Sequence, residues 1–315
     1  MINENCVLIL GAGASAPYGF PTGAQLKQII CNNFDKVWEK FVFDRFQNFL
    51  ADSTFQEQKT IAKNFVNDFK MFEHDSIDLF LDIYPGYADI GKKAIFLTIL
   101  DAEKKILGNG KVQDWYSELF KRMIGSSGNY FKLSQNNLNI ITFNYDRSLE
   151  YYFYNIFNNF TKSITVKEKI EELKKIKIFH VYGKLSDLPW ENENNSLDFG
   201  ANIWMNQLEM KKDDIKTIFE RRNKTKELDP ILNSIQLADK VYFLGFGFAS
   251  ENVEIISLDK HIKPDQLVYV SDYDNRRVRL ETRMRGLGVW QENRTTIVIG
   301  GDCKQVIEDY LFSKE

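Results

Sequence analysis

The sequence predicts an α/β fold in which helices cover both faces of a doubly wound, Rossmann-like parallel sheet of six or more strands. Short apolar runs recur along the chain, at residues 7–10, 138–142, 176–181, 241–244, 267–270 and 295–299. Continuous apolar runs are typical of strands buried on both faces of a parallel sheet. Segments with helical spacing separate these runs, and this alternation favours a doubly wound architecture.

Composition restricts the classes of protein to which the chain can belong. It has 315 residues, of which 43% are hydrophobic, enough to bury the core of one large domain. A formal net charge of −3 excludes a generally basic nucleic-acid binder. The three cysteines form no Cys-x-x-Cys pair, so no zinc module is expected. No apolar run approaches the ~20 residues of a membrane helix and no leader is evident, so we expect a cytoplasmic protein without membrane contact.

Two insertions interrupt the alternation of strands and helices. Residues 24–135 show helical spacing of aromatic and aliphatic side chains and no strand-like run, which predicts a helical insertion. Residues 184–232 begin as a polar loop and continue into a charged helix, which predicts a second insertion. We therefore interpret residues 1–315 as a single domain that contains both.

The first apolar run ends in Gly-Ala-Gly-Ala-Ser at residues 11–15. Glycine has no Cβ, so it allows the backbone to approach a phosphate closely, and the motif predicts a nucleotide site. A dehydrogenase has the same G-x-G-x-x-A spacing, but there a continuous helix follows. Here Pro17 and Pro21 interrupt the segment, so we expect a loop over residues 14–23 and a helix that starts near residues 22–26.

Polar or glycine-containing segments also follow the later strands. They are Thr-Phe-Asn-Tyr-Asp at 142–146, Phe-His-Val-Tyr-Gly at 179–183, Gly-Phe-Gly-Phe at 245–248, Ser-Asp-Tyr-Asp at 271–274 and Gly-Gly-Asp-Cys at 300–303. In an open parallel sheet, ligands bind at the carboxyl ends of the strands, so these segments are expected to converge on one crevice.

These segments together resemble the sirtuin-like (SIR2-like) family, specifically its prokaryotic, defence-associated branch that hydrolyses NAD⁺. Residues 11–15 with Gly-Phe-Pro at 19–21 resemble the cofactor loop of that family, and residues 142–146 resemble its Thr-x-Asn-x-Asp signature. Residues 245–247 resemble its second glycine turn, and residues 272–274 and 301–303 match adenosine-contacting positions. The resemblance spans the strands but neither insertion.

The resemblance implies a single SIR2-like catalytic domain that cleaves NAD⁺ to nicotinamide and ADP-ribose. It further implies an anti-phage, abortive-infection effector that a protein partner or oligomerisation activates, with no metal and no direct nucleic-acid binding. The implied catalytic residues are Asn144, His180 and Asp146. The implied cofactor-binding residues are Gly11, Ala12, Gly13, Ala14, Ser15, Pro21, Thr142, Tyr182, Gly245, Gly247, Asp272 and Cys303.

The identity of the catalytic base stays open between two residues. The family commonly has His-Gly at the end of the third strand, where this chain has Tyr182-Gly183 with His180 two positions earlier. A strand repeats every two residues, so His180 and Tyr182 are expected to point to the same side. An imidazole with a pKa near ~6.5 accepts a proton at neutral pH more readily than a phenol with a pKa near ~10, which favours His180.

Other interpretations of the same residues remain. Asn144 is expected to hold ribose hydroxyls or water, and Asp146 to stabilise a cationic sugar, but both suit a cap for a helix over 147–153 as well. A non-catalytic NAD or ADP-ribose sensor is the competing function. A deacylase is disfavoured, because the zinc module is absent and Thr-Gly follows Pro21.

The sequence also leads to expectations about which dinucleotide is preferred and about the role of a cluster of arginines. Asp272 and Asp274 are expected to repel the 2′-phosphate of NADP⁺. We interpret the arginines at positions 276, 277, 279, 283 and 285 as a helix surface or a partner contact.

Overall fold

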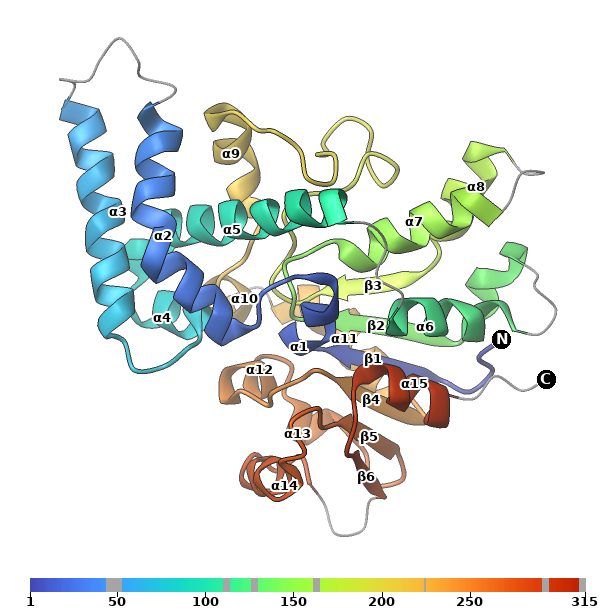
Figure 1. Cartoon of the computed structure of the whole chain (residues 1–315). Coiled ribbons are helices and arrows are strands. Elements are labelled where there is room, and N and C mark those ends of the chain that lie inside the picture. The colour runs from blue at the N-terminus through green and yellow to red at the C-terminus, as the bar shows by residue number, and fades with distance from the viewer. Residues whose placement is uncertain are drawn as a thin grey trace.

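A six-stranded, all-parallel sheet forms the centre of the molecule in the computed structural model (Figure 1). The structure describes residues 1–43, 53–109, 114–125, 130–160, 165–223, 225–290 and 295–311. Within them the strands are β1 (Cys6–Leu10), β2 (Leu138–Thr142), β3 (Lys177–His180), β4 (Lys240–Leu244), β5 (Leu267–Ser271) and β6 (Thr296–Ile299). Their order across the sheet is β3-β2-β1-β4-β5-β6.

All six predicted strands are confirmed, each to within one or two residues of its expected bounds. The apolar runs are buried as expected: every residue of β1 is buried, because β2 and β4 flank it and helices cover the sheet. Leu10 at the end of β1 pairs with both Thr142 and Leu244. The three central strands therefore end at the same level, and the segments that follow them emerge side by side.

Helices connect successive strands and cover the sheet. Between β1 and β2 the structure has α1 (Ala12–Ser15), α2 (Gly23–Phe43), α3 (Ser53–Met71), α4 (Ile77–Ile83), α5 (Ala88–Asn109) and α6 (Trp115–Ile124). Between β2 and β4 it has α7 (Ser148–Phe160), α8 (Val166–Leu173), α9 (Met205–Lys211), α10 (Ile218–Arg222) and α11 (Asp229–Leu237). The later helices are α12 (Ser250–Ile255), α13 (Leu258–His261), α14 (Arg277–Gly286) and α15 (Cys303–Tyr310). Figure 1 shows α6 and α15 in front of the sheet and α11 behind it, which is a Rossmann-like arrangement.

The described part of residues 24–135 is helical and contains no strand. Residues 44–52, 110–113 and 126–129 of this predicted insertion lie outside the described residues. In α2, the residues buried toward α3 and α5 recur every four positions, as an amphipathic helix requires; they are Leu26, Ile30, Phe34, Trp38 and Val42. Figure 1 shows α2, α3 and α4 on the side toward which the strands' carboxyl ends point.

The prediction of a loop over residues 14–23 is wrong in part. The short helix α1 follows β1 directly, and a 3₁₀ turn η1 (Ala16–Tyr18) continues it. Pro17 is accommodated because it lies in the first positions of that turn, where its missing N–H leaves no hydrogen bond unmade. Gly19 then ends the turn with a φ of 92°, and α2 begins at Gly23, within the predicted range.

A buried ion pair joins the second insertion to the first. Nη2 of Arg147 lies 2.7 Å from Oε2 of Glu103 in α5, and both side chains are fully buried. The same guanidinium donates to the carbonyls of Leu197 at 2.7 Å and of Asp198 at 3.1 Å, both in the second insertion. Arg147 therefore ties α5 and residues 197–198 to the start of α7.

A search of the described helices for one both long and apolar enough to cross a membrane found none.

Candidate functional site

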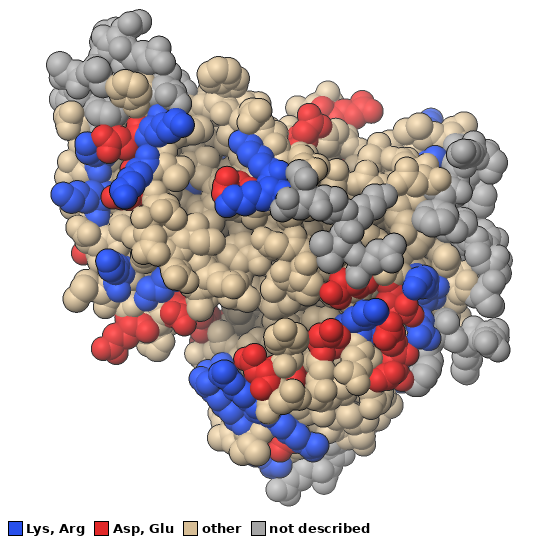
Figure 2. Space-filling view, viewed as in Figure 1, with Lys and Arg blue, Asp and Glu red and all other residues tan. Residues whose placement is uncertain are grey.

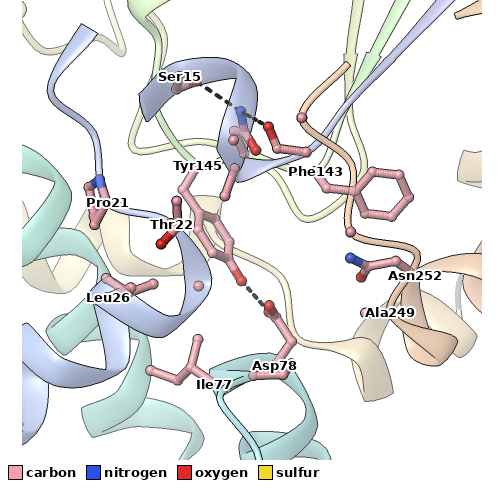
Figure 3. A pocket seen from close by; sticks show the side chains of 18 of the residues that line it. Ser15, Pro21, Thr22, Leu26, Ile77, Asp78, Phe143, Tyr145, Ala249 and Asn252 are labelled. Atoms are coloured by element: carbon pink, nitrogen blue, oxygen red, sulfur yellow. Dashed lines mark hydrogen bonds between the residues drawn. The ribbon is translucent and has the colours of Figure 1, made fainter. Parts of the chain in front are cut away.

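Two adjoining cavities open at the carboxyl end of the sheet, where β1 and β4 lie side by side. Strand order reverses there, and such a switch point is where open α/β sheets bind ligands. The inner cavity, about 410 Å³, lies toward β2 and the helical insertion (Figure 3). The outer cavity, about 790 Å³, lies toward β5 and α14. They share a rim made of Gly13, Thr22, Gly245, Phe246 and Gly247.

The glycines of this rim are required by contact between two backbone turns. The N–H of Gly13 donates to the carbonyl of Gly245 at 3.1 Å. A Cβ on Gly245 would lie 2.1 Å from the nitrogen of Ala14, and the φ of Gly245 is +56°. A Cβ on Gly11 would lie 2.5 Å from the carbonyl oxygen of Gly245. Only Gly247 has open space where a Cβ would stand, so it alone of these glycines leaves room on the cavity side.

Asn144 lies in the wall of the inner cavity, and only the nitrogen of its side-chain amide makes hydrogen bonds among the described residues. Its Nδ2 donates to the carbonyl of Gly11 at 3.1 Å and to Oγ of Ser15 at 2.9 Å. Its Oδ1 is buried and has no hydrogen-bond partner among the described residues. A buried acceptor of this kind is uncommon in proteins and fits a ligand that donates a hydrogen bond. The contacts of Nδ2 also explain why an amide is needed, since a carboxylate could not donate them.

Asp146 is found both at a helix start and beside the inner cavity. Its Oδ1 accepts a hydrogen bond from the N–H of Ser148 at 3.0 Å and so anchors the start of α7. The carboxyl group also lines the inner cavity. Burial raises the pKa of Asp146, while hydrogen bonds from Ser148 and Ser15 act in the opposite direction.

His180 does not line either cavity, so the expectation that it faces the reacting sugar does not agree with the structure. Its Nε2 lies 2.6 Å from Oε1 of Glu150, and its Nδ1 lies 3.0 Å from the carbonyl oxygen of Asn144. Both ring nitrogens are thus held within the protein. The expectation that His180 and Tyr182 point to the same side fails because β3 ends at His180, so the two-residue alternation stops there.

Tyr182 does line the inner cavity, and its hydroxyl donates to Oδ1 of Asn252 at 2.9 Å. Burial raises the pKa of Tyr182 well above its ordinary value, and the carboxylates of Asp78 and Glu251 add to the effect. The phenol therefore keeps its proton at neutral pH. It can position a neighbour or donate a hydrogen bond, but it is a poor base.

Asp78 and Glu251 are among the acidic residues of the inner cavity that sequence reasoning missed. Asp78 comes from α4 of the helical insertion, and Figure 3 shows Tyr145 and Asp78 pointing toward each other, joined by a hydrogen bond from the Tyr145 hydroxyl. Burial raises the pKa of Asp78 to about 6. No motif marks either residue, because the fold alone brings α4 and α12 to the cavity.

The outer cavity holds Asp272 and Cys303, two of the predicted cofactor-binding residues. Oδ1 of Asp272 accepts the N–H of Arg276 at 3.0 Å, while its Oδ2 is buried without a partner among the described residues. Burial raises the pKa of Cys303 to about 12, so this group stays a neutral thiol. The cavity is also lined by Arg276, Arg279 and Arg283, which the sequence analysis assigned to a surface or partner contact.

The other predicted residues divide into those that line the inner cavity and those that support it. Ala12, Ser15 and Pro21 line it. Ala14 is fully buried, and its carbonyl accepts Nε1–H of Trp115 at 2.7 Å. Thr142 is buried as well, and its Oγ1 accepts the N–H of Asn144 at 3.1 Å. Ala14 and Thr142 therefore fix the turns and do not reach the ligand space.

Across the described ranges, no group of three or more His, Cys, Asp or Glu side chains is placed to hold a metal ion. Neither the protein-family models nor the curated proteins that we searched contain a match to this chain. The function must therefore be inferred from the site itself.

Proposed function

We propose that the two cavities together bind NAD⁺, and that the chain hydrolyses the bond between nicotinamide and ribose. The observation that carries this proposal is that one residue lining each cavity has a buried acceptor without a partner among the described residues. These acceptors are Oδ1 of Asn144, which lines the inner cavity, and Oδ2 of Asp272, which lines the outer one. Each suits a ribose hydroxyl, which donates a hydrogen bond. A ligand with one ribose at each end and a pyrophosphate between them matches two cavities joined by a glycine-containing rim.

The residues of the inner cavity suit cleavage of a glycosidic bond. As the bond to nicotinamide breaks, positive charge develops on the ribose, and water then attacks it with release of a proton. Asn144 would orient a ribose hydroxyl, and the carboxyl group of Asp146 would face the developing charge. The proton needs an acceptor, and His180 lies outside the cavity, so we assign that role to Asp78. Its pKa of about 6 leaves it mostly ionised at neutral pH and close to the value of an efficient base.

A sensor that binds NAD⁺ or ADP-ribose without turnover is the second candidate. The observation that favours it is the position of His180, whose imidazole is held by Glu150 and the carbonyl of Asn144. The inner cavity then has no imidazole base among its described lining residues.

The biological role rests on the resemblance alone. We propose that hydrolysis of NAD⁺ serves as the effector step of a cytoplasmic anti-phage system, and that a protein partner or oligomerisation triggers it. The local contacts of the site supply no argument about that trigger.

The test compares the wild type with Asn144→Ala and with a matched control, Asn139→Ala. Asn139 lies on β2, the strand that leads to Asn144, but it lines a separate cavity at the amino end of the sheet. Nicotinamide release is measured by chromatography, and binding of NAD⁺ and ADP-ribose by calorimetry. We expect Asn144→Ala to lower binding or turnover by about tenfold or more, since it removes a buried hydrogen-bonding group, and Asn139→Ala to change neither.

The outcomes separate the candidates. Nicotinamide release that depends on Asn144 supports the hydrolase. Binding that depends on Asn144 without release, in the presence of proteins encoded nearby, supports the sensor. If neither NAD⁺ nor ADP-ribose binds the folded wild-type chain, both functions are wrong.

A further inference from the structure

The backbone N–H groups of the two glycine turns are largely engaged within the protein. Gly11 donates to the carbonyl of Leu244 at 3.0 Å, Gly13 to that of Gly245 at 3.1 Å, and Ala14 to that of Gly11 at 2.9 Å. The N–H of Gly245 donates to Oγ of Ser271 at 2.9 Å. A glycine turn usually binds phosphate through such N–H groups. Here those four already have acceptors, so they are not available to an anionic ligand at the rim.

Side chains of α14 and its N-cap supply other donors. Arg276 is the N-cap of α14, and Arg279 and Arg283 lie four residues apart on one side of the helix. All three line the outer cavity. Nη1 of Arg283 donates to the carbonyl of Gly247 at 2.7 Å, which holds this guanidinium at the rim shared by the two cavities. Figure 2 shows Lys and Arg side chains gathered where Figure 1 places α14.

The carboxylates around the outer cavity pair directly with only one of these arginines among the described residues, and at a long distance. Asp114 accepts the N–H of Trp115 at 2.6 Å, and Asp302 accepts that of Gln305 at 2.9 Å, so both cap helices. Arg276 has a loose contact of 3.8 Å with Asp274. Arg279 and Arg283 have no carboxylate partner within the described ranges.

The remaining arginines of α14 have different surroundings. Arg277 pairs with Glu281 at 2.7 Å. Arg285 lies over the ring of Trp290, 4.8 Å from its centroid. Neither lines the outer cavity. The helix and its N-cap thus have three arginines that line the cavity and two that other residues already hold.

We propose that Arg276, Arg279 and Arg283 form an anion-binding face that holds the phosphate groups of the ligand, with Arg283 at the pyrophosphate. A guanidinium presents paired N–H donors that match two phosphate oxygens, which makes arginine suited to this task. The assignment of the phosphates to a pyrophosphate rests on the proposed function, whereas the anion-binding face itself does not. The ligand class is a phosphorylated nucleoside whose ribose reaches Asp272.

The test uses two double variants with equal loss of charge. Arg279→Gln/Arg283→Gln removes two positive charges that line the outer cavity. Arg277→Gln/Arg285→Gln removes two positive charges of α14 that do not line it. Calorimetry measures the binding of adenosine, ADP, ADP-ribose and inorganic pyrophosphate to each folded protein. In the wild type we expect ADP to bind more tightly than adenosine by about tenfold or more. The first variant should lose this advantage with the adenosine affinity unchanged, and the second should keep it.

The ligands distinguish failure of this proposal from failure of the proposed function. Suppose that pyrophosphate binds the wild type, that only Arg279→Gln/Arg283→Gln loses this binding, and that ADP-ribose does not bind. The anion-binding face is then supported, and the proposal of a dinucleotide ligand is wrong. If ADP-ribose binds equally well to both double variants, the dinucleotide stands and the anion-binding face is wrong. The anion-binding face is also wrong if both variants lose ADP equally, or if neither ADP nor pyrophosphate binds the wild type.

Discussion

His180 and Glu150 form a short contact, 2.6 Å between Nε2 and Oε1, outside the lining of both cavities. The ammonium group of Lys184 lies 3.7 Å from the same carboxylate oxygen. The three side chains are largely buried, so His180 and Lys184 are the partners of a carboxylate inside the fold. Its position beside the Thr-x-Asn-x-Asp segment makes it a support of that segment, since its Nδ1 faces the carbonyl of Asn144.

Acid should weaken the fold through Glu150. Burial acts to raise the pKa of Glu150, but the neighbouring His180 and Lys184 lower it to about 2 from an ordinary value of 4.5. A carboxyl group with a depressed pKa contributes stability above its unfolded value and loses it as the pH falls. We expect the free energy of unfolding to drop as the pH falls from 4.5 to about 2. Urea titrations at each pH measure this drop. It should be smaller in Glu150→Gln, whereas the exposed control Glu193→Gln should show the same drop as the wild type.

Replacing His180 should affect stability more than ligand binding. His180→Gln leaves Glu150 buried with fewer partners, and loss of one member of a buried pair costs about 3–5 kcal/mol. Because His180 lines neither cavity, ADP-ribose affinity should stay within about threefold of the wild type, a change of under 1 kcal/mol. A variant of unchanged melting temperature that no longer binds ADP-ribose would contradict this assignment.

Asp78→Asn should stabilise the protein near neutral pH. Burial raises the pKa of Asp78 to about 6 from an ordinary value of 3.8, so the native state loses stability as the pH rises between those values. Asparagine keeps an acceptor for the Tyr145 hydroxyl and removes the charge. We expect a gain of about 1–2 kcal/mol at about pH 7 that disappears near about pH 4. Asp82→Asn, on the same helix, is the control: it loses an ion pair with Arg222 and should show no such gain.

The same Asp78 substitution tests catalysis separately from stability. If Asp78 accepts the proton of the attacking water, Asp78→Asn should lower kcat by about 10²–10⁴-fold and abolish the acidic limb of the pH–rate profile. An enzyme that keeps its kcat and its acidic limb would remove Asp78 from the mechanism while leaving the stability prediction intact.

Two neighbouring glycines should differ sharply in their tolerance of alanine. In Gly245→Ala the new Cβ would lie 2.1 Å from the nitrogen of Ala14, and the backbone has a φ of +56°, which strains any L residue. We expect a loss of more than about 2 kcal/mol, seen as a lowered melting temperature. In Gly247→Ala the Cβ meets open space, so the melting temperature should match the wild type. Equal effects of the two substitutions would argue against the backbone contact.

Tyr182→Phe should reduce activity only modestly. It removes the hydrogen bond to Asn252, but the raised pKa of the phenol argues against proton transfer by Tyr182. We expect a change in kcat of less than about tenfold, against the 10²–10⁴-fold loss typical of a missing base. A larger loss of kcat, with the fold intact by circular dichroism, would make Tyr182 a candidate for the catalytic base again.

Local sequence patterns predicted the sheet well, because its strands are buried on both faces. Val7 and Ile140 sit in continuous apolar runs, and such runs need no tertiary information to be recognised. The short helix at Ala12–Ser15 was missed, since four residues cannot display a helical period.

The site was predicted best where residues follow a strand closely. Asn144 and Asp272 reach the cavities because their positions are fixed by β2 and β5. His180 was misplaced because the alternation argument requires a strand that continues past it, and β3 does not. Asp78 and Arg279 could not be found in this way, since long-range packing of α4 and α14 alone decides what they face.

The side chain of Arg147 has a consequence for how the two insertions pack together. It follows Asp146 in the chain, and its guanidinium bridges Glu103 of one insertion and the carbonyl of Leu197 in the other. Displacement of either insertion would disturb contacts of the same residue. Arg147 directly follows Asp146, which lines the inner cavity. These contacts therefore link the packing of both insertions to a residue beside the inner cavity.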